Sequence, residues 1–194
     1  MTWRFGPAHS HVRWTCSYLG ILTVTGLFRE VQATLRLDGL DVSGWSVEAT
    51  IFAASIDSGS ALRDEVLRSA DFLDVERFPL LTFRSTRVGR DGAHYRVAGA
   101  LTIHGVTRDV VLDLEDRGEV VDWLGQRSRV LVAETTLQRT DFQVGPPPWA
   151  EALIGTDVHV SLQLELLRAN EAIQPGGSHR RAEVVRPAPV VAAA

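Results

Sequence analysis

Few residues in this chain combine a type and a spacing suited to chemistry, and the first of them are Arg63 and Asp64. The two stand side by side at the start of a segment whose apolar residues recur at helical spacing. A guanidinium in that place can donate hydrogen bonds to a carbonyl or hydroxyl on the head of a bound molecule. The alternative is structural, with Asp64 near the positive end of the helix dipole and Arg63 in solvent. The sequence leaves both interpretations open.

Three histidines and a serine invite a metal or a hydrolase interpretation. Zinc takes about three or four ligands with supporting hydrogen bonds, but no Cys or acidic residue stands at a metal-binding spacing from His9, His11 and His104. Ser58 lacks the Gly-x-Ser-x-Gly frame of a nucleophile elbow, so a small hydrolase built on Ser58 and His104 is the weaker alternative. Cys16 alternates with polar residues, which predicts a buried, inert thiol. We expect neither a metal site nor an enzyme.

The composition excludes several further classes. The chain has 194 residues, of which 45% are hydrophobic, enough for one sizeable domain. The formal net charge is only −4 and the arginines are scattered, so no nucleic-acid partner is expected. All the basic residues are Arg, which leaves no lysine for Schiff-base chemistry. No apolar run suits a membrane span and no secretory signal is visible, so we expect a cytoplasmic protein without an integral membrane segment.

Alternation of apolar and polar residues predicts an antiparallel β-protein. It begins with Val12, Trp14 and Cys16 on one face of a strand and recurs at short intervals up to Leu166. No long helical crossovers are available for a parallel sheet. One short amphipathic helix is expected between a strand that ends at residues 55–56 and a strand over residues 80–85, with apolar positions at Leu62, Val66, Leu67, Phe72 and Leu73.

Turn and loop signals divide the rest of the chain. A strand with inward residues from Val31 to Leu37 ends at the turn signal Asp38-Gly39. Three consecutive prolines, 146–148, predict a loop in extended polyproline geometry. After residue 168 the periodicity is lost and Pro, Gly, Ala and Arg dominate. We therefore expect a domain over residues 1–168 and a flexible low-complexity tail over residues 169–194.

A set of short motifs extends over roughly residues 3 to 168 in one order. The motifs are Ala8-His9-Ser10, Ala54-Ser55-Ile56-Asp57-Ser58-Gly59, Arg63-Asp64, Leu67-Arg68-Ser69, Asp71-Phe72, Phe78-Pro79, Thr82-Phe83-Arg84-Ser85-Thr86, Gly99-Ala100-Leu101-Thr102-Ile103-His104-Gly105-Val106-Thr107-Arg108, Arg139 and Asp141-Phe142. With these motifs the chain resembles the YceI-like family of lipocalin-like polyisoprenoid-binding proteins. The resemblance implies an antiparallel barrel of about eight strands that holds one long isoprenoid chain.

Two departures from the family pattern fall where the mouth of such a barrel is expected. Val66 stands where His is common, two residues after the Arg-Asp pair, and Gln143 replaces the Gly that usually follows the Asp-Phe pair. Both departures concern the recognition of the ligand's head more than the binding of its chain.

A barrel of this size is either filled by side chains or wide enough for one ligand. The inward faces mix aromatic residues with Ala and Gly, which suits interdigitated packing as well as a slot, and the resemblance favours the slot. The ligand-binding residues predicted on this basis are Trp14, Phe28, Leu35, Ile51, Arg63, Asp64, Phe72, Phe83, Tyr95, Gly99, Leu101, Ile103 and Phe142. No cofactor is required, and the expected ligand is an isoprenoid quinone or polyprenyl lipid that the protein carries or stores.

The alternative is a filled barrel that acts as an interaction module. It predicts a homodimer or a partner complex formed through Phe52, which lies on an otherwise polar strand face, or through the Pro-rich loop.

Overall fold

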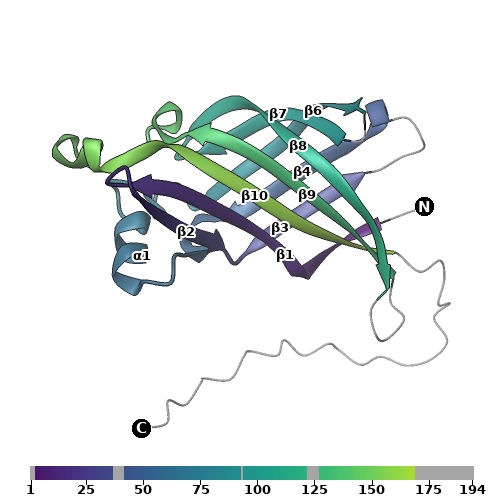
Figure 1. The fold of residues 1–194 in the computed structure, drawn as a ribbon, viewed down its shortest axis with the longest axis horizontal. Helices are drawn as coiled ribbons and strands as arrows, with labels where there is room; N and C mark the ends of the chain where they lie inside the picture. Colours follow the sequence, from purple (N-terminus) through teal and green to yellow (C-terminus); the bar gives the residue numbers. More distant parts are fainter. Residues whose placement is uncertain (1–2, 37–41, 93, 122–126, 169–194) are drawn as a thin grey trace, which may run out of the picture.

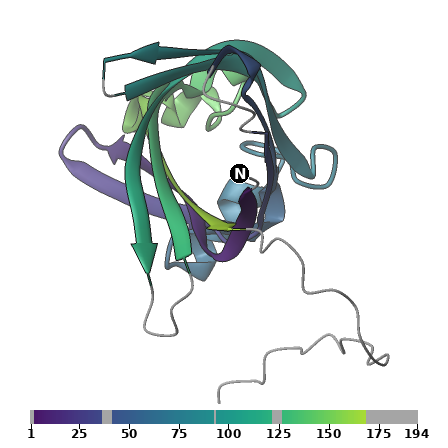
Figure 2. The same cartoon turned by 90° about the vertical axis from the view of Figure 1, so that its right-hand side faces the viewer.

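The protein folds into one antiparallel sheet that curls into a barrel (Figures 1 and 2). The computed structural model describes residues 3–36, 42–92, 94–121 and 127–168. Its strands are β1 (Trp3–Tyr18), β2 (Leu22–Phe28), β3 (Val31–Arg36), β4 (Ser46–Phe52), β5 (Ile56–Asp57), β6 (Leu80–Asp91), β7 (His94–Ile103), β8 (Val106–Val121), β9 (Arg127–Gln138) and β10 (Ile154–Arg168). The helices are α1 (Ala61–Arg68) and the short 3-10 turns η1 (Val42–Gly44), η2 (Ala53–Ser55), η3 (Arg139–Phe142) and η4 (Pro148–Leu153).

The barrel closes through two bent strands. The sheet order is β3-β4-β6-β7-β8-β9-β10-β1-β2-β5, so its two edges are β3 and β5. Strand β2 continues into β3, and β4 continues through η2 into β5. Backbone hydrogen bonds from Arg29 to Ser55 and from Phe52 to Glu30, both 3.1 Å, tie the two bends together. When each bent pair is counted as one strand the barrel has eight, which confirms the predicted fold class.

The antiparallel order gathers the connections at two ends. The β1–β2 turn, α1, η3 and η4 lie at one end, which we call the α1 end. The start of β1, the β6–β7 turn and the last residues of β8 lie at the opposite, N-terminal end. Figure 1 shows α1 and the chain's N-terminus on opposite sides of the barrel.

The sequence located the helix and the strand after it but misplaced three boundaries. Strand β4 ends at Phe52, because the chain turns through η2 before the two-residue strand β5. Helix α1 ends at Arg68, where the Ser69 N–H caps two helix carbonyls, so that Phe72 and Leu73 lie beyond the helix. Strand β6 begins at Leu80 as predicted and runs further than expected, to Asp91.

Other predictions fall at the margins of the described structure. Pro147 is extended as expected, with φ −53° and ψ 155°, but the chain then forms η4 instead of leading straight into β10. The predicted end of a strand at Leu37, the Asp38-Gly39 turn and the tail over residues 169–194 lie outside the described residues. Among the helices that are described, none is long and apolar enough to span a bilayer.

Candidate functional site

An apolar cavity of about 610 Å³ lies inside the barrel. The exposed members of its wall are Ser17 and Tyr18 at the end of β1 and Leu62, Arg63 and Val66 on α1. Because these residues share the α1 end, the cavity opens there, beneath the helix. The volume lies within the range of roughly 300–1,000 Å³ that is typical of small-molecule sites.

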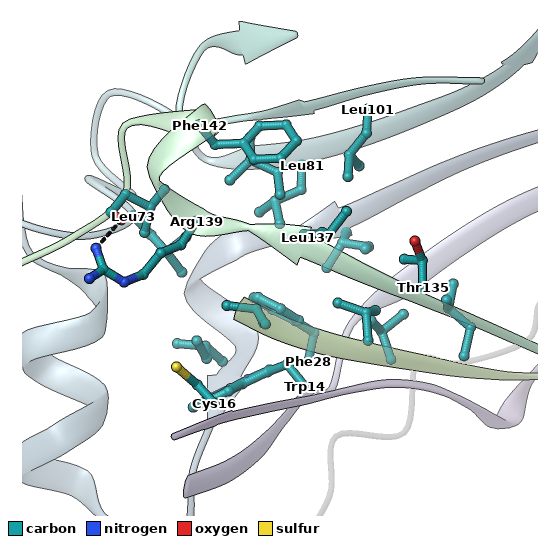
Figure 3. A pocket seen from close by; sticks show the side chains of 18 of the residues that line it. Trp14, Cys16, Phe28, Leu73, Leu81, Leu101, Thr135, Leu137, Arg139 and Phe142 are labelled. Atoms are coloured by element: carbon teal, nitrogen blue, oxygen red, sulfur yellow. Dashed lines mark hydrogen bonds between the residues drawn. The ribbon is translucent and has the colours of Figure 1, made fainter. Parts of the chain in front are cut away.

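The inward faces of the strands supply most of the wall (Figure 3). Nine of the thirteen residues predicted from the sequence line it: Trp14, Phe28, Ile51, Arg63, Phe72, Phe83, Leu101, Ile103 and Phe142. The structure brings these nine around one space, so they form a single candidate site. Their contact with a ligand stays a prediction.

Leu35 and Tyr95 face inward but lie outside the cavity wall. They pack against the larger hydrophobic cluster of the barrel, where Tyr95 lies against Trp45 with 5.2 Å between ring centroids. Alternation along a strand shows which face a residue occupies but not how deep in the barrel it lies. The prediction had the right face for both residues and the wrong depth.

Gly99 also lies outside the cavity, for a different reason. A Cβ at this position would come within 2.5 Å of the Arg84 carbonyl oxygen and 2.6 Å of the Phe83 ring. The glycine therefore lets Phe83 lie directly on β7. The sequence had suggested that Gly99 creates a slot for a ligand, and the structure shows that it does not.

Arg63 and Asp64 both hold the turn that precedes α1. The buried Asp64 carboxylate accepts hydrogen bonds from the Ser58 N–H (2.9 Å) and hydroxyl (2.5 Å). Arg63 donates from Nε to the Ser58 hydroxyl and from Nη2 to the Ser58 carbonyl, both at 2.8 Å. The structural interpretation is therefore right for Asp64, which is absent from the wall. Arg63 has the same structural role and in addition lies at the cavity mouth.

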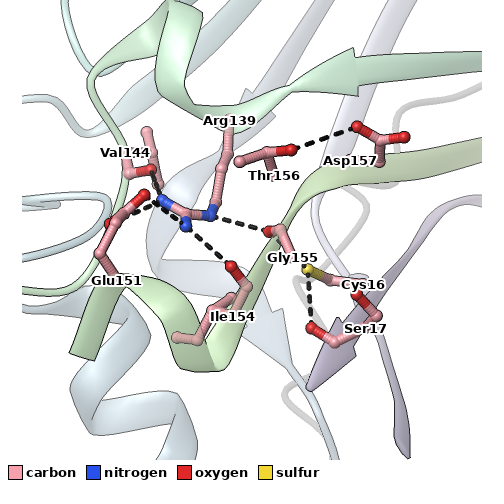
Figure 4. Close-up of polar contacts among 9 residues, drawn as sticks. All are labelled: Cys16, Ser17, Arg139, Val144, Glu151, Ile154, Gly155, Thr156 and Asp157. Atoms are coloured by element: carbon pink, nitrogen blue, oxygen red, sulfur yellow. Dashed lines mark hydrogen bonds and ion pairs between the residues drawn. The ribbon is translucent and has the colours of Figure 1, made fainter. Parts of the chain in front are cut away.

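Arg139 lines the cavity, although no spacing pattern singled it out as part of the site. Its side chain is 6% exposed, and its guanidinium holds the Pro-rich segment against the barrel (Figure 4). It donates to the carbonyls of Gly155, Val144 and Ile154 at 2.9–3.1 Å and to both carboxylate oxygens of Glu151 at 2.7 and 3.3 Å. All five N–H groups thus have acceptors within the protein, so Arg139 supports the wall without a donor left over for a ligand.

Several other missed wall residues follow the alternation of β9 and β10. They include Thr135, Leu137, Val158, Val160 and Leu162, all on inward faces that the sequence had already identified. Thr135 is the one polar side chain of these five, and its hydroxyl donates to the Val111 carbonyl at 2.9 Å. The alternation identified these residues as inward-facing, but alternation does not distinguish the wall of a cavity from a filled core.

Two further polar groups in the wall are buried. Burial raises the pKa of the Cys16 thiol, whose Sγ donates to the Gly155 carbonyl at 3.3 Å. A protonated thiol is a poor nucleophile, which agrees with the predicted inert role. The Trp14 indole N–H has no hydrogen-bond partner and no exposed surface, so neighbouring protein atoms cover it and it does not face the open cavity.

The hydrolase and metal interpretations gain no support from the geometry. The Ser58 hydroxyl is bonded to Asp64 and Arg63, whereas His104 lies in the β7–β8 turn with its ring 4.7 Å from that of Phe78. Ser58 and His104 therefore form no nucleophile–base pair. Within the part of the chain that is described, no three His, Cys, Asp or Glu side chains are grouped to hold a metal ion.

Comparison with known proteins agrees with this architecture. The model of the YceI-like domain matches residues 3–166. A UPF0312 protein of Pectobacterium atrosepticum is 36% identical over 136 residues, 70% of this chain and 71% of that protein. Among solved structures, BcnA of Burkholderia cenocepacia has a TM-score of 0.75 at 22% identity, covering 83% of this chain and 98% of BcnA. A polyisoprenoid binding domain from Saccharophagus degradans has a TM-score of 0.61 at 14% identity, covering 86% and 98% of the two chains. The chain belongs to the YceI-like family.

Proposed function

We propose that this protein binds a long-chain isoprenoid lipid, an isoprenoid quinone or polyprenyl compound, and carries or stores it inside the barrel. The observation that supports this proposal is the cavity itself, an apolar space of about 610 Å³ with its mouth beneath α1. The likeness in fold to the polyisoprenoid binding domain from Saccharophagus degradans is our reason for choosing this ligand class among apolar candidates.

The chemistry of the wall suits a hydrocarbon chain. The Arg139 and Thr135 polar groups that border the cavity already have partners within the protein, so a ligand poor in oxygen leaves neither of them without a hydrogen bond. Burial of hydrocarbon contributes about 0.8 kcal/mol per CH₂, so each five-carbon prenyl unit contributes on the order of 3–4 kcal/mol before the costs of binding. A few prenyl units are therefore enough for tight binding.

Solvent extraction followed by mass spectrometry tests the proposal on protein purified from a host that makes prenyl lipids. We expect a long hydrophobic species in the extract. In parallel, thermal melts are recorded with and without an added prenyl quinone, since a ligand that binds only the folded state raises the midpoint. An empty extract together with an unchanged midpoint would refute the proposal.

The filled-barrel alternative does not fit a cavity of this size. A homodimer formed through Phe52 or the Pro-rich loop stays a prediction of the sequence, and analytical ultracentrifugation measures it directly. The cytoplasmic location likewise stays a prediction, which cell fractionation checks.

A further inference from the structure

Large apolar side chains are exposed around the cavity mouth. Ile21 is 86% exposed, Trp149 82% and Leu62 75%. Soluble proteins seldom expose several such side chains at one place unless the surface binds something. The exposed set, which we call the apolar rim, consists of Leu19, Ile21 and Leu22 in and beside the β1–β2 turn, Leu62 and Val66 on α1, and Trp149 on η4.

The rim is continuous with the cavity. Leu62 and Val66 line the cavity and are also exposed, so whatever covers the rim also meets the opening. The Leu19 N–H donates to the Leu153 carbonyl at 2.7 Å, which holds the β1–β2 turn against the end of η4. All three elements lie at the same end of the barrel in Figure 1.

The rim carries almost no net charge. The β1–β2 turn has no ionisable group between Tyr18 and Leu22, and the two arginines of α1 are balanced by its two acidic residues. On η4 the carboxylate of Glu151 is paired with Arg139 at 2.7 Å. Attraction to anionic lipids requires a cluster of basic residues, which the rim lacks. An uncharged apolar rim instead matches a zwitterionic lipid surface.

The shape of the rim also favours a fluid partner. Its side chains project from three separate elements around an opening, whereas a protein interface needs a closely complementary packed surface. A bilayer adapts to separate projections, and Trp is favoured at its interface. We propose that the α1 end docks on the surface of a zwitterionic lipid bilayer, with the cavity mouth facing the lipid. This inference rests on the proposed function, because the purpose of docking is the passage of a water-insoluble ligand between the bilayer and the barrel.

Vesicle flotation tests the docking with the full chain and vesicles of pure phosphatidylcholine. Ile21→Ser and Trp149→Ser change rim residues that do not line the cavity, and Val121→Ser at the N-terminal end is the matched control, because Val121 is 58% exposed. We expect wild type and Val121→Ser to float with the vesicles. Each rim variant should bind about tenfold more weakly, equivalent to about 1.4 kcal/mol. Binding should change little with salt or with added anionic lipid.

A second measurement separates docking from ligand binding. A short-chain ubiquinone is offered either dissolved in cyclodextrin or incorporated in the vesicles. The Ile21→Ser/Trp149→Ser double variant should take up quinone from cyclodextrin as wild type does, and much more slowly from vesicles. Wild type that takes quinone from cyclodextrin but does not float overturns the docking proposal alone. Wild type that floats but takes no quinone from either source overturns the proposed function and leaves docking supported.

A second copy of this protein is the competing occupant of the rim. If wild type sediments as a dimer that Ile21→Ser or Trp149→Ser dissociates, and does not float, then a second copy covers the rim and the bilayer proposal is wrong. Equal flotation of wild type and the double variant would overturn it as well, because binding would then not depend on the rim.

Discussion

Ala49→Leu is the substitution that most directly tests whether the cavity holds the ligand. Ala49 lies on the inward face of β4, opposite Ala33 on β3, and both line the cavity. It is only half-buried although it faces inward, so its open surface lies in the cavity. Leucine adds three carbons there and displaces a similar amount of ligand. At about 0.8 kcal/mol per CH₂, the loss approaches about 2.4 kcal/mol, or about 50-fold in Kd.

The assay is a titration with a short-chain ubiquinone, monitored by the quenching of tryptophan fluorescence, to which Trp14 in the cavity wall contributes. Ala100→Leu is the matched control, since Ala100 lies on β7 between the inward residues Gly99 and Leu101 and does not line the cavity. The Ala49→Leu protein without ligand should melt at or above the wild-type temperature, because the new side chain fills empty space. The reasoning fails if Ala49→Leu folds and binds quinone with the wild-type Kd, or if Ala100→Leu weakens binding as much.

Substitutions at four further positions test the packing and polar contacts of the barrel by measurement of stability. Gly99→Leu should destabilise the fold by more than about 2 kcal/mol in urea unfolding, because even its Cβ would lie 2.5 Å from a backbone oxygen; a stable variant contradicts this packing. Arg139→Met should cost about 3–5 kcal/mol in the same assay, since it leaves three carbonyls and a carboxylate without their donor. Gln143 has φ +57°, a left-handed conformation that glycine adopts easily and a β-branched residue does not. The melting temperature of Gln143→Gly should therefore be close to that of wild type, and that of Gln143→Val well below it. Equal melting temperatures of the two variants would show that the backbone there is relaxed. Burial raises the pKa of Asp116, but hydrogen bonds from Arg129 and from the Gly118 N–H outweigh it and the pKa lies below its usual value. Because the pKa is lower in the folded state, the unfolded chain binds this proton more readily. The stabilisation of the fold by the ionised Asp116 is therefore complete above about pH 4 and is lost as pH falls through the folded-state pKa. In acid titrations of the free energy of unfolding, Asp116→Asn should flatten that loss.

The fold was predictable because one pattern determines most of it. Alternation places Val12, Trp14 and Cys16 on one face, and the same period recurs along the chain, so that only a curled antiparallel sheet buries every apolar face. The break at η2 was not predictable, because residues 53–55 continue the alternation in sequence. The backbone bonds to Arg29 and Glu30 bend the chain there, and these depend on strands that are distant in sequence.

The sequence predicted which residues of the candidate site face into the barrel, but not how deep in the barrel each one lies. Tyr95 and Leu101 alternate on the same face of β7, yet Tyr95 packs against Trp45 outside the cavity wall and Leu101 lines the cavity. Depth depends on strand tilt and register around the barrel, which a single sequence does not contain. Arg139 was recognisable only as part of a family motif, since its five acceptor atoms come from Val144, from Glu151 on η4 and from the first two residues of β10, and no spacing pattern connects these residues.

Two features that are unfavourable for stability alone occur at the same end of the barrel. The cavity leaves its wall without the contacts that a filled core provides, and Leu62 and Val66 on α1 expose apolar surface that could have been buried by a larger helical cap. Leu35, Trp45 and Tyr95 of the same barrel pack into its hydrophobic cluster without lining the cavity, so the chain is able to fill part of such a space. Departures from good packing are expected where function requires them. A hollow interior with an apolar mouth suits a protein that receives a hydrocarbon from a lipid phase, because the hydrocarbon then passes from the bilayer to the cavity wall without crossing water.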